Sequence, residues 1–383
     1  MMVCILQELV FLLTRVMVSR GKVRANPFNK GKTKSKEVFE MRNYTRKFLF
    51  VACAIALIGC FLVPPSFAAE PVVRLKYASF MPPAHPIAKL SEEWCKELEK
   101  RTDGRVKVAF FPAGTLVTAN QMYDGVVKGI IDIGWSIMSY TPGRMPLSEV
   151  IVLPLGYKSG GQATRMANAF YLKFKPKEYD DVKLFYLHAH GPGFFHTKGA
   201  VNKIEDLKGL RIKSDANTSK VVAAAGATPT TMPMLETYDA LKRGLADGVL
   251  LPIETLKGWK FGETCKYTYI NHGNAYANGF FIAMNKERWN SLPKDIQQII
   301  DKLNEEWFEK QAKLWSWVDE DGLEFAKKSG QKLVYASPEE EAKMRERMKP
   351  LLDAYVKSMK EKGLPGDEVL KWCQDYLKTA PAN

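Results

Sequence analysis

The chain has 383 residues, a formal net charge of +14 and 46% hydrophobic residues. Residues 1–68 hold 11 of the 56 Lys and Arg and 3 of the 42 Asp and Glu, so 45 and 39 remain in the other 315 residues, a net charge of +6. That remainder has no basic stripe with interleaved aromatic residues, which excludes a nucleic-acid-binding protein, and its length predicts two domains.

The cysteine pattern argues against both a metal site and a disulfide framework. Three of the six cysteines lie in residues 1–68, and the other three are far apart in the sequence: Cys95, Cys265 and Cys373. Three such cysteines allow at most one bridge and leave one thiol over. We therefore expect no metal ion and no cofactor.

The N-terminal region has the features of an export signal. Residues 1–40 precede Met41, which we expect to be the true start. Residues 41–68 are typical of a signal peptide, with positive residues, then an apolar run over 48–62, then small residues before Ala69. The apolar run is shorter than the roughly 20 residues that a membrane span needs. We predict a periplasmic protein, and a lipid anchor at Cys60 is the second possibility.

The first half of the mature chain alternates between strand and helix patterns. Strands are expected at 73–79, 105–110 and 131–137, and helices at 87–98 and 119–127. Such alternation predicts a parallel sheet covered by helices. Proteins with open sheets of this kind bind ligands at the carboxyl ends of the strands.

One spacing occurs twice in the chain. The pattern Tyr-Asp, four residues, Gly, two residues, Asp begins at Tyr123 and again at Tyr238. Both copies lie at the end of an expected helix and lead into an expected strand. This repetition predicts two similarly wound domains that face each other across a cleft.

Residues 202–252 contain two further strand-helix units. The first strand, 210–213, carries two cations, Arg211 and Lys213, on the face opposite Ile212, because side chains alternate along a strand. We interpret this pair as a possible anion grip. The alternative is two solvated charges on a surface strand.

A long helix is expected from Pro293 to Lys328. Apolar residues recur through this segment at helical spacing, and Ser291 and Pro293 are typical of a helix start. A continuous helix of this length would reach about 54 Å, which exceeds the diameter of a small domain. It would therefore run along both domains, and helices at 339–359 and 367–376 would close the fold.

The chain resembles the solute-binding proteins of tripartite ATP-independent periplasmic (TRAP) transporters, of the dicarboxylate type, over nearly all of residues 72–375. The resemblance is carried by the order and spacing of these motifs: Glu205 to Lys213, Gly226 to Pro229, Glu236, Tyr238, Ala240-Leu241 and Asp247-Gly248. It implies a two-lobed α/β periplasmic binding protein fold with a long helix spanning both domains. It also implies a small organic acid ligand and TRAP membrane permease subunits as partners.

The implied domains are each built from two segments. Domain I would comprise residues 69–190 and about 279–320, and domain II residues 191–278 and about 321–383. The protein is expected to be a monomer without enzymatic activity.

The resemblance places Lys213 where most relatives carry an Arg that pairs with a substrate carboxylate. A lysine offers a point charge in place of a guanidinium fork, and Arg211 is expected to support it. Polar positions of sialic-acid-binding relatives are replaced here by Leu251 and Gly193, and Met234 stands where an aromatic residue is frequent. An anion with an apolar or aromatic body therefore fits better than a sugar acid.

Aromatic residues at expected strand ends and in the following loops complete the candidate site, together with Arg144 in a loop similar to one branch of the family. The candidate ligand-binding residues are Lys213, Arg211, Phe80, Trp135, Tyr140, Arg144, Phe194, Met234 and Leu251.

Catalytic signals are weak. We find no nucleophile elbow, phosphate loop or haem attachment motif. His188 and His190 could share a metal ion, but no Cys or carboxylate lies nearby at ligand spacing, so we expect hydrogen-bonded histidines beside a cleft. The alternatives are a secreted enzyme acting on a carboxylated substrate and an ABC-type binding protein, and the long helix favours the TRAP class over the latter.

Overall fold

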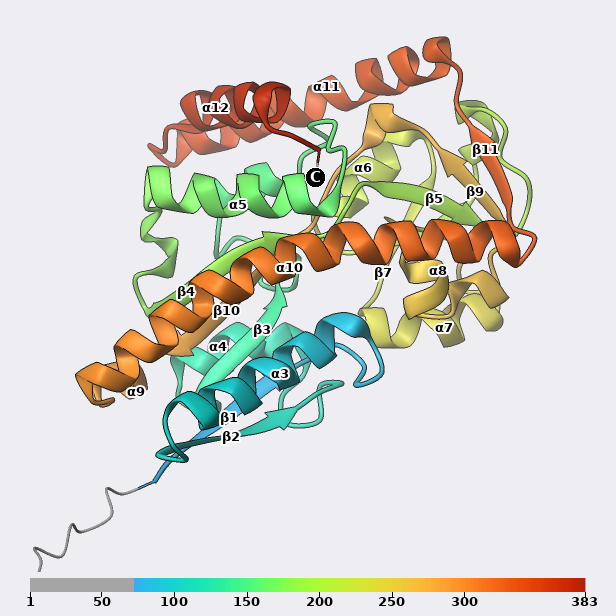
Figure 1. Ribbon diagram of the computed structural model, residues 1–383. Coiled ribbons are helices and arrows are strands. Elements are labelled where there is room, and N and C mark those ends of the chain that lie inside the picture. The colour runs from blue at the N-terminus through green and yellow to red at the C-terminus, as the bar shows by residue number, and fades with distance from the viewer. Residues whose placement is uncertain (1–71, 383) are drawn as a thin grey trace, which may run out of the picture. The chain divides into compact units, whose positions relative to one another are not determined.

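The computed structural model describes residues 72–382, so the expected extension, the signal peptide and Cys60 lie outside the described residues. The described chain forms two mixed sheets flanked by helices, with strand orders β2-β1-β3-β10-β4 and β11-β9-β5-β8-β6-β7 (Figure 1). The expected α/β fold with two lobes is confirmed. We call the parts built on these sheets the first and the second lobe.

The first sheet consists of β1 (Val73–Ser79), β2 (Val106–Phe111), β3 (Ile133–Ile137), β4 (Val182–Ala189) and β10 (Gly279–Asn285). The first three strands are parallel, and β10 runs antiparallel between β3 and β4. Its α-helices are α3 (Pro86–Arg101), α4 (Met122–Val127) and α5 (Gly160–Phe174), with the short α9 (Lys286–Asn290) after β10. The expected strand-helix alternation is therefore present.

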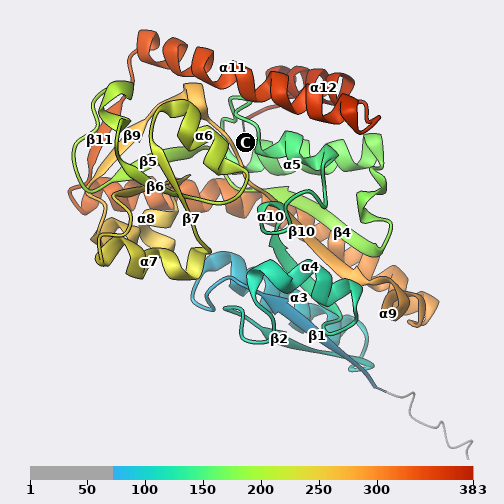
Figure 2. The ribbon, with the colours of Figure 1, turned by 180° about the vertical axis from the view of Figure 1, so that it is seen from behind.

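The second sheet consists of β5 (Gly193–Thr197), β6 (Arg211–Ser214), β7 (Thr228–Thr231), β8 (Gly248–Pro252), β9 (Tyr267–Ile270) and β11 (Lys332–Tyr335). Its helices are α6 (Thr218–Ala225), α7 (Met234–Lys242) and α8 (Thr255–Gly258). Figure 2 shows α6 and α7 on opposite sides of β6 and β7. Val249 and Leu251 accordingly pack with the α7 side, whereas Leu250 packs with the α6 side.

Short 3-10 helices occupy several connections: Ala119–Gln121, Met138–Tyr140, Leu147–Val152, Lys177–Tyr179, Ile204–Leu207, Phe261–Glu263 and His272–Asn274.

The repeated Tyr-Asp-Gly-Asp spacing has the same structural role in both lobes. Asp132 accepts a hydrogen bond from the backbone amide of Lys76 in β1 at 2.7 Å, and Asp247 accepts one from that of Arg211 in β6 at 2.9 Å. The repetition thus reflects equivalent strand connections.

The long helix α10 (Lys294–Lys328) is continuous over 35 residues, as the sequence predicted. It packs against α3, α5 and β4 of the first lobe and then against α8 and β11 of the second (Figure 1). Its buried stripe includes Trp307 in the first half and Trp315, Val318 and Ala326 in the second. One rigid element therefore supports both lobes.

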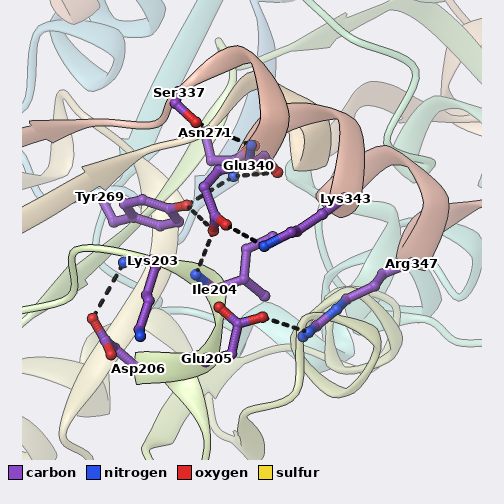
Figure 3. Close-up of polar contacts among 10 residues, drawn as sticks. All are labelled: Lys203, Ile204, Glu205, Asp206, Tyr269, Asn271, Ser337, Glu340, Lys343 and Arg347. Carbon is purple, nitrogen blue, oxygen red and sulfur yellow. Dashed lines mark hydrogen bonds and ion pairs between the residues drawn. The ribbon is translucent and has the colours of Figure 1, made fainter.

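The helix α11 (Pro338–Glu361) also contacts both lobes. At its start, Glu340 accepts hydrogen bonds from the amide of Ile204 at 2.8 Å and from the hydroxyl of Tyr269 at 3.3 Å (Figure 3). Further along, Tyr355 and Met359 pack into the core of the first lobe. Burial of an apolar face thus fixes the second half of α11 on the first lobe.

The C-terminal helix α12 (Gly366–Thr379) packs against α5 and α11. Its buried residues Leu370, Cys373 and Leu377 belong to the core of the first lobe. This packing differs from the expectation that residues beyond about 321 all belong to the second domain. An amphipathic pattern shows which face of a helix is buried, but not which lobe covers that face.

Candidate ligand-binding site

A cavity lies between the lobes, at the ends of strands from both sheets. The first lobe contributes Phe80, Met81, Ile137 and Phe280 to its wall, and the second contributes Lys213, Asp215, Met234, Leu251, Glu254 and Trp259. Trp315 of α10 and two crossover residues, His190 and Asn278, complete the central part. The wall is therefore mainly apolar with a few polar groups, as is usual for small-molecule sites.

Lys213 is the cation of this cavity. Its side chain comes from β6 and is 1% exposed, and its ammonium contacts the sulfur of Met234 at 3.4 Å. No carboxylate oxygen of residues 72–382 forms an ion pair or hydrogen bond with it. Burial lowers the pKa of Lys213 from 10.5 to about 8, and the nearby Asp215 opposes this shift. A dehydrated ammonium without an oxygen partner is a favourable site for an anion.

The oxygens of Asp215 accept hydrogen bonds from groups other than Lys213. One accepts from the backbone amides of Asn217 and Thr218 at 3.1 and 3.0 Å. The other accepts from the side-chain amide of Asn278 at 2.8 Å. Asp215 therefore stabilises the start of α6 and reduces the positive potential at Lys213 without neutralising it through contact.

His190 is held as a neutral ring at the crossover between the lobes. Its Nε2 accepts from the backbone amide of Asn278 at 3.0 Å, so the proton is on Nδ1, which donates to the carbonyl of Gly191 at 2.6 Å. Burial lowers the pKa of His190 to about 4. His190 and His188 are thus hydrogen-bonded histidines beside the cleft, and no group of three potential metal ligands occurs within 72–382.

Stacked rings form the apolar part of the wall. Phe80 lies over Trp135 with ring centroids 5.4 Å apart and planes 6° apart, and Phe280 lies over the same indole at 5.6 Å and 14°. Trp315 stacks on Phe280 at 5.2 Å, and Trp259 of the second lobe faces Phe80 at 6.4 Å. Because neighbouring rings are nearly parallel, the wall favours a flat apolar ligand body.

Four residues predicted from the sequence line this cavity: Lys213, Phe80, Met234 and Leu251. Two more lie directly behind its wall. Trp135 is covered by Phe80, and its indole nitrogen is hydrogen-bonded to His188. The hydroxyl of Tyr140 accepts from the backbone amide of Met234 at 2.9 Å.

Arg211 is not brought together with Lys213, contrary to the expected pair of cations. Its side chain is 46% exposed and binds Asp247 through two contacts of 2.8 and 3.0 Å. The two residues do lie two positions apart on β6, but a strand rises about 3.3 Å per residue, and the cavity lies at the carboxyl end of β6. Arg211 therefore remains in the surface ion pair at the strand's beginning.

Arg144 and Phe194 also lie outside the cavity. The guanidinium of Arg144 pairs with Asp181 and covers the ring of Tyr123 at 5.0 Å. Phe194 lines a different cavity, beside Leu323 and His272. Phe194 belongs to β5, and its ring packs edge-on against the ring of His272, with the ring centroids 5.3 Å apart.

The sequence interpretation missed several residues of the cavity: Asp215, Glu254, Trp259, Asn278, Phe280 and Trp315. Asp215 follows β6 directly and Glu254 lies two residues after β8, so the rule that ligands bind at strand ends could have found them. Phe280 and Trp315 carried no such signal, because each has the pattern of an ordinary core residue.

The three described cysteines are buried and free. Burial raises the pKa of Cys265 to about 11 and that of Cys373 to about 12, so neither is an activated thiol. Over residues 72–382, we also find no helix that is long and apolar enough to cross a membrane.

Two α/β lobes around a mainly apolar cavity, joined by a helix that supports both, define a solute-binding protein of the periplasmic type. Residues 77–358 match the family of bacterial extracellular solute-binding proteins, family 7. The chain belongs to this family, which is the DctP family of TRAP transporter receptors. Its members bind solutes for transport and are not enzymes.

Solved structures of TRAP solute-binding proteins have the same fold. One from Desulfovibrio salexigens is 32% identical, with a TM-score of 0.72 over 81% of this chain and 97% of the other. One from a marine metagenome, described as specific for aromatic acid ligands, is 27% identical with a TM-score of 0.76 over 80% and 98%. One from Rhodoferax ferrireducens, in complex with copurified benzoate, is 28% identical with a TM-score of 0.75 over 80% and 98%.

Proposed function

We propose that this receptor captures an aromatic monocarboxylate in the cavity and delivers it to a TRAP membrane permease. The observation that carries the proposal is the ammonium of Lys213, which is 1% exposed and has no oxygen partner within residues 72–382. A carboxylate beside it would replace the lost hydration with a charge-assisted hydrogen bond. Lys213 is therefore proposed as the primary ligand contact.

The stacked rings support the aromatic body of the ligand. Phe80 and Phe280 present nearly parallel faces from the first lobe, and Trp259 presents its ring from the second. Met234 and Leu251 add apolar surface beside Lys213. Aromatic acids are bound by two of the related proteins of known structure, which supports the same ligand class here.

The remaining predicted residues take different roles in this proposal. Trp135 and Tyr140 position the wall from behind. Arg211, Arg144 and Phe194 do not contact the ligand, because the two arginines are in surface ion pairs and the phenylalanine lines another cavity.

Binding is proposed to close the lobes over the ligand. Tyr140 and Ser139 of the first lobe are bonded to Met234 and Asn278 on the other side of the cavity. The chain crosses between the lobes after Ala189 and before Gly279, and these crossings are the proposed hinge. We assign residues 72–190 and about 279–320 to the first lobe, and residues 191–278 with the following β11 to the second.

Helix α11 bridges this division, because it contacts both lobes. Delivery to the permease then requires a protein located in the periplasm. The family is extracellular by description, which agrees with the expected signal peptide at residues 41–68.

The test is a ligand screen with the mature protein. Protein purified under native conditions is denatured, and the released small molecules are identified by mass spectrometry. Benzoate and mandelate are then added to the ligand-free protein, and melting temperature is measured. We expect a rise of a few degrees at 100 times Kd, since binding then stabilises by about 2.7 kcal/mol.

Benzyl alcohol is the matched control, because it keeps the ring and lacks the carboxylate. It should leave the melting temperature unchanged, and the acids should be recovered chemically intact. A protein that responds to sugar acids and to no aromatic acid would contradict the proposed ligand class.

A further inference from the structure

Glu254 is a second polar group in the wall of the cavity that holds Lys213. It follows β8, precedes α8 and is 4% exposed. Its Oε2 lies 3.0 Å from Nε2 of His85, whereas its Oε1 has no hydrogen-bond partner in residues 72–382.

His85 belongs to the first lobe and binds Glu254 through a ring nitrogen whose protonation can be assigned. His85 is the N-cap of α3, and its Nδ1 accepts from the backbone amide of Ile87 at 3.3 Å. A ring nitrogen that accepts carries no proton, so the proton is on Nε2 and is donated to Glu254. This bond uses one carboxylate oxygen and leaves the other available to a ligand.

Close backbone contacts fix the position of Glu254. A Cβ atom on Gly322 of α10 would lie 2.6 Å from the Cα of Glu254, so only glycine allows this approach. A Cβ atom on Gly258 would lie 2.7 Å from both Oε2 of Glu254 and Nε2 of His85. The long helix therefore packs directly against the backbone of Glu254, and Gly258 of α8 leaves room for its bond with His85.

A second buried acid, Asp319 of α10, lies beside Glu254 and accepts from its backbone amide at 3.4 Å. Burial is the larger cause, and the nearby Glu254 the second, of a pKa of Asp319 that lies well above its usual range. Asp319 is therefore held in its neutral form. Along the described cavity wall, the one cation is Lys213 and the two carboxylates are Asp215 and Glu254. The wall therefore has one more acidic side chain than basic side chains.

We propose that Glu254 is the specificity-determining residue of this site: it selects an aromatic monocarboxylate with a hydrogen-bond donor on the ring and rejects a dicarboxylate. This inference rests on the proposed function, in which Lys213 holds the first carboxylate. A hydroxyl group on the ring donates to Oε1 of Glu254, while a second carboxylate there meets a like charge in a dry cavity. Selection thus combines one attractive and one repulsive contact.

Calorimetric titration of the parent protein and of Glu254→Gln tests this inference. The probes are benzoate, 3-hydroxybenzoate, 4-hydroxybenzoate, isophthalate and terephthalate. We expect the parent to bind one hydroxybenzoate roughly 10-fold tighter than benzoate, because a hydrogen bond to a charged group has this strength. We also expect it to bind both dicarboxylates at least about 100-fold more weakly than benzoate.

Glu254→Gln should reduce the hydroxyl preference below about threefold and improve dicarboxylate binding at least about 10-fold, since it removes the charge and keeps the shape. Glu254→Asp is the second variant: it keeps the charge but shortens the side chain, so it should still reject dicarboxylates while losing the hydroxyl preference. Melting temperatures of both variants show whether they are folded.

The two levels of the proposal fail in different ways. If the parent binds benzoate and Glu254→Gln leaves both preferences unchanged, the role of Glu254 is overturned while the aromatic-acid receptor stands. If the parent binds none of the five acids, the proposed function fails and the selectivity inference fails with it.

Discussion

The hydroxyl oxygen of Tyr140 accepts a hydrogen bond from the backbone amide of Met234 at 2.9 Å. Tyr140 ends the short helix after β3 in the first lobe, and Met234 begins α7 in the second. The bond therefore joins the lobes directly beside the cavity. Burial raises the pKa of Tyr140, so the phenol stays neutral throughout the physiological range.

Tyr140→Phe should weaken ligand binding roughly 2- to 10-fold, because a hydrogen bond of this kind contributes about 0.5–1.5 kcal/mol to the closed form. Calorimetry with benzoate measures the effect. Tyr335→Phe is the matched control, since Tyr335 is exposed and its hydroxyl has no partner in the described chain. Equal affinities for Tyr140→Phe and the parent would show that this contact does not contribute to closure.

The affinity for a carboxylate should depend on pH through Lys213. Its pKa is about 8 in the empty cavity, so the ammonium fraction falls about 10-fold per pH unit above that value. Benzoate affinity should fall in parallel between pH 8 and pH 10. In Lys213→Arg the guanidinium stays charged, so binding at high pH should persist. A parent protein with constant affinity up to pH 10 would contradict this assignment.

Lys213 should also destabilise the empty protein at neutral pH. The unfolded lysine has the ordinary pKa of 10.5, whereas the folded one is lowered to about 8, so the unfolded state binds more protons between these values. Stability contributed by this group must therefore rise as pH increases from about 8 to about 10.5. Lys213→Met should stabilise the empty protein at pH 7 by up to about 3 kcal/mol.

Urea denaturation at pH 7 and pH 10 gives this difference, and the gain from Lys213→Met should shrink at the higher pH. Arg211→Met serves as the control, because its surface pair with Asp247 contributes under about 1 kcal/mol. A variant Lys213→Met that is less stable than the parent at both pH values would argue against a dehydrated, unpaired ammonium.

Export remains a prediction from the sequence, because residues 1–71 lie outside the described part of the chain. Protein recovered from the periplasm should begin near Ala69 when its intact mass is measured. A new N-terminus at a diacylglyceryl-modified Cys60 would instead establish an anchored form.

The sequence predicted the elements of this fold well where local patterns were strong. The helix expected over 293–328 is observed over 294–328, because its apolar stripe continues without a break. The repeated Tyr-Asp-Gly-Asp spacing correctly predicted two similar windings. Where α12 would pack was not predictable, since amphipathicity shows which face is buried and not what covers it.

The candidate site was predictable only in part. Lys213 was placed through the family's carboxylate position, and the structure adds its burial and its lack of an oxygen partner. Arg211 was linked to it through strand alternation, which describes the face of a strand but not the position along it. Pairing with Asp247, 36 residues away, then fixes Arg211 at the surface.

The central claim is that Lys213 holds the carboxylate of an aromatic acid, and calorimetric titration of benzoate into three proteins tests it most directly. The parent should bind one benzoate per chain, and Arg211→Met should match it within about twofold. Lys213→Met should bind about 30-fold to several thousand-fold more weakly, since losing one partner of a buried charge pair costs about 2–5 kcal/mol. Unchanged benzoate affinity in a folded Lys213→Met protein would contradict the account.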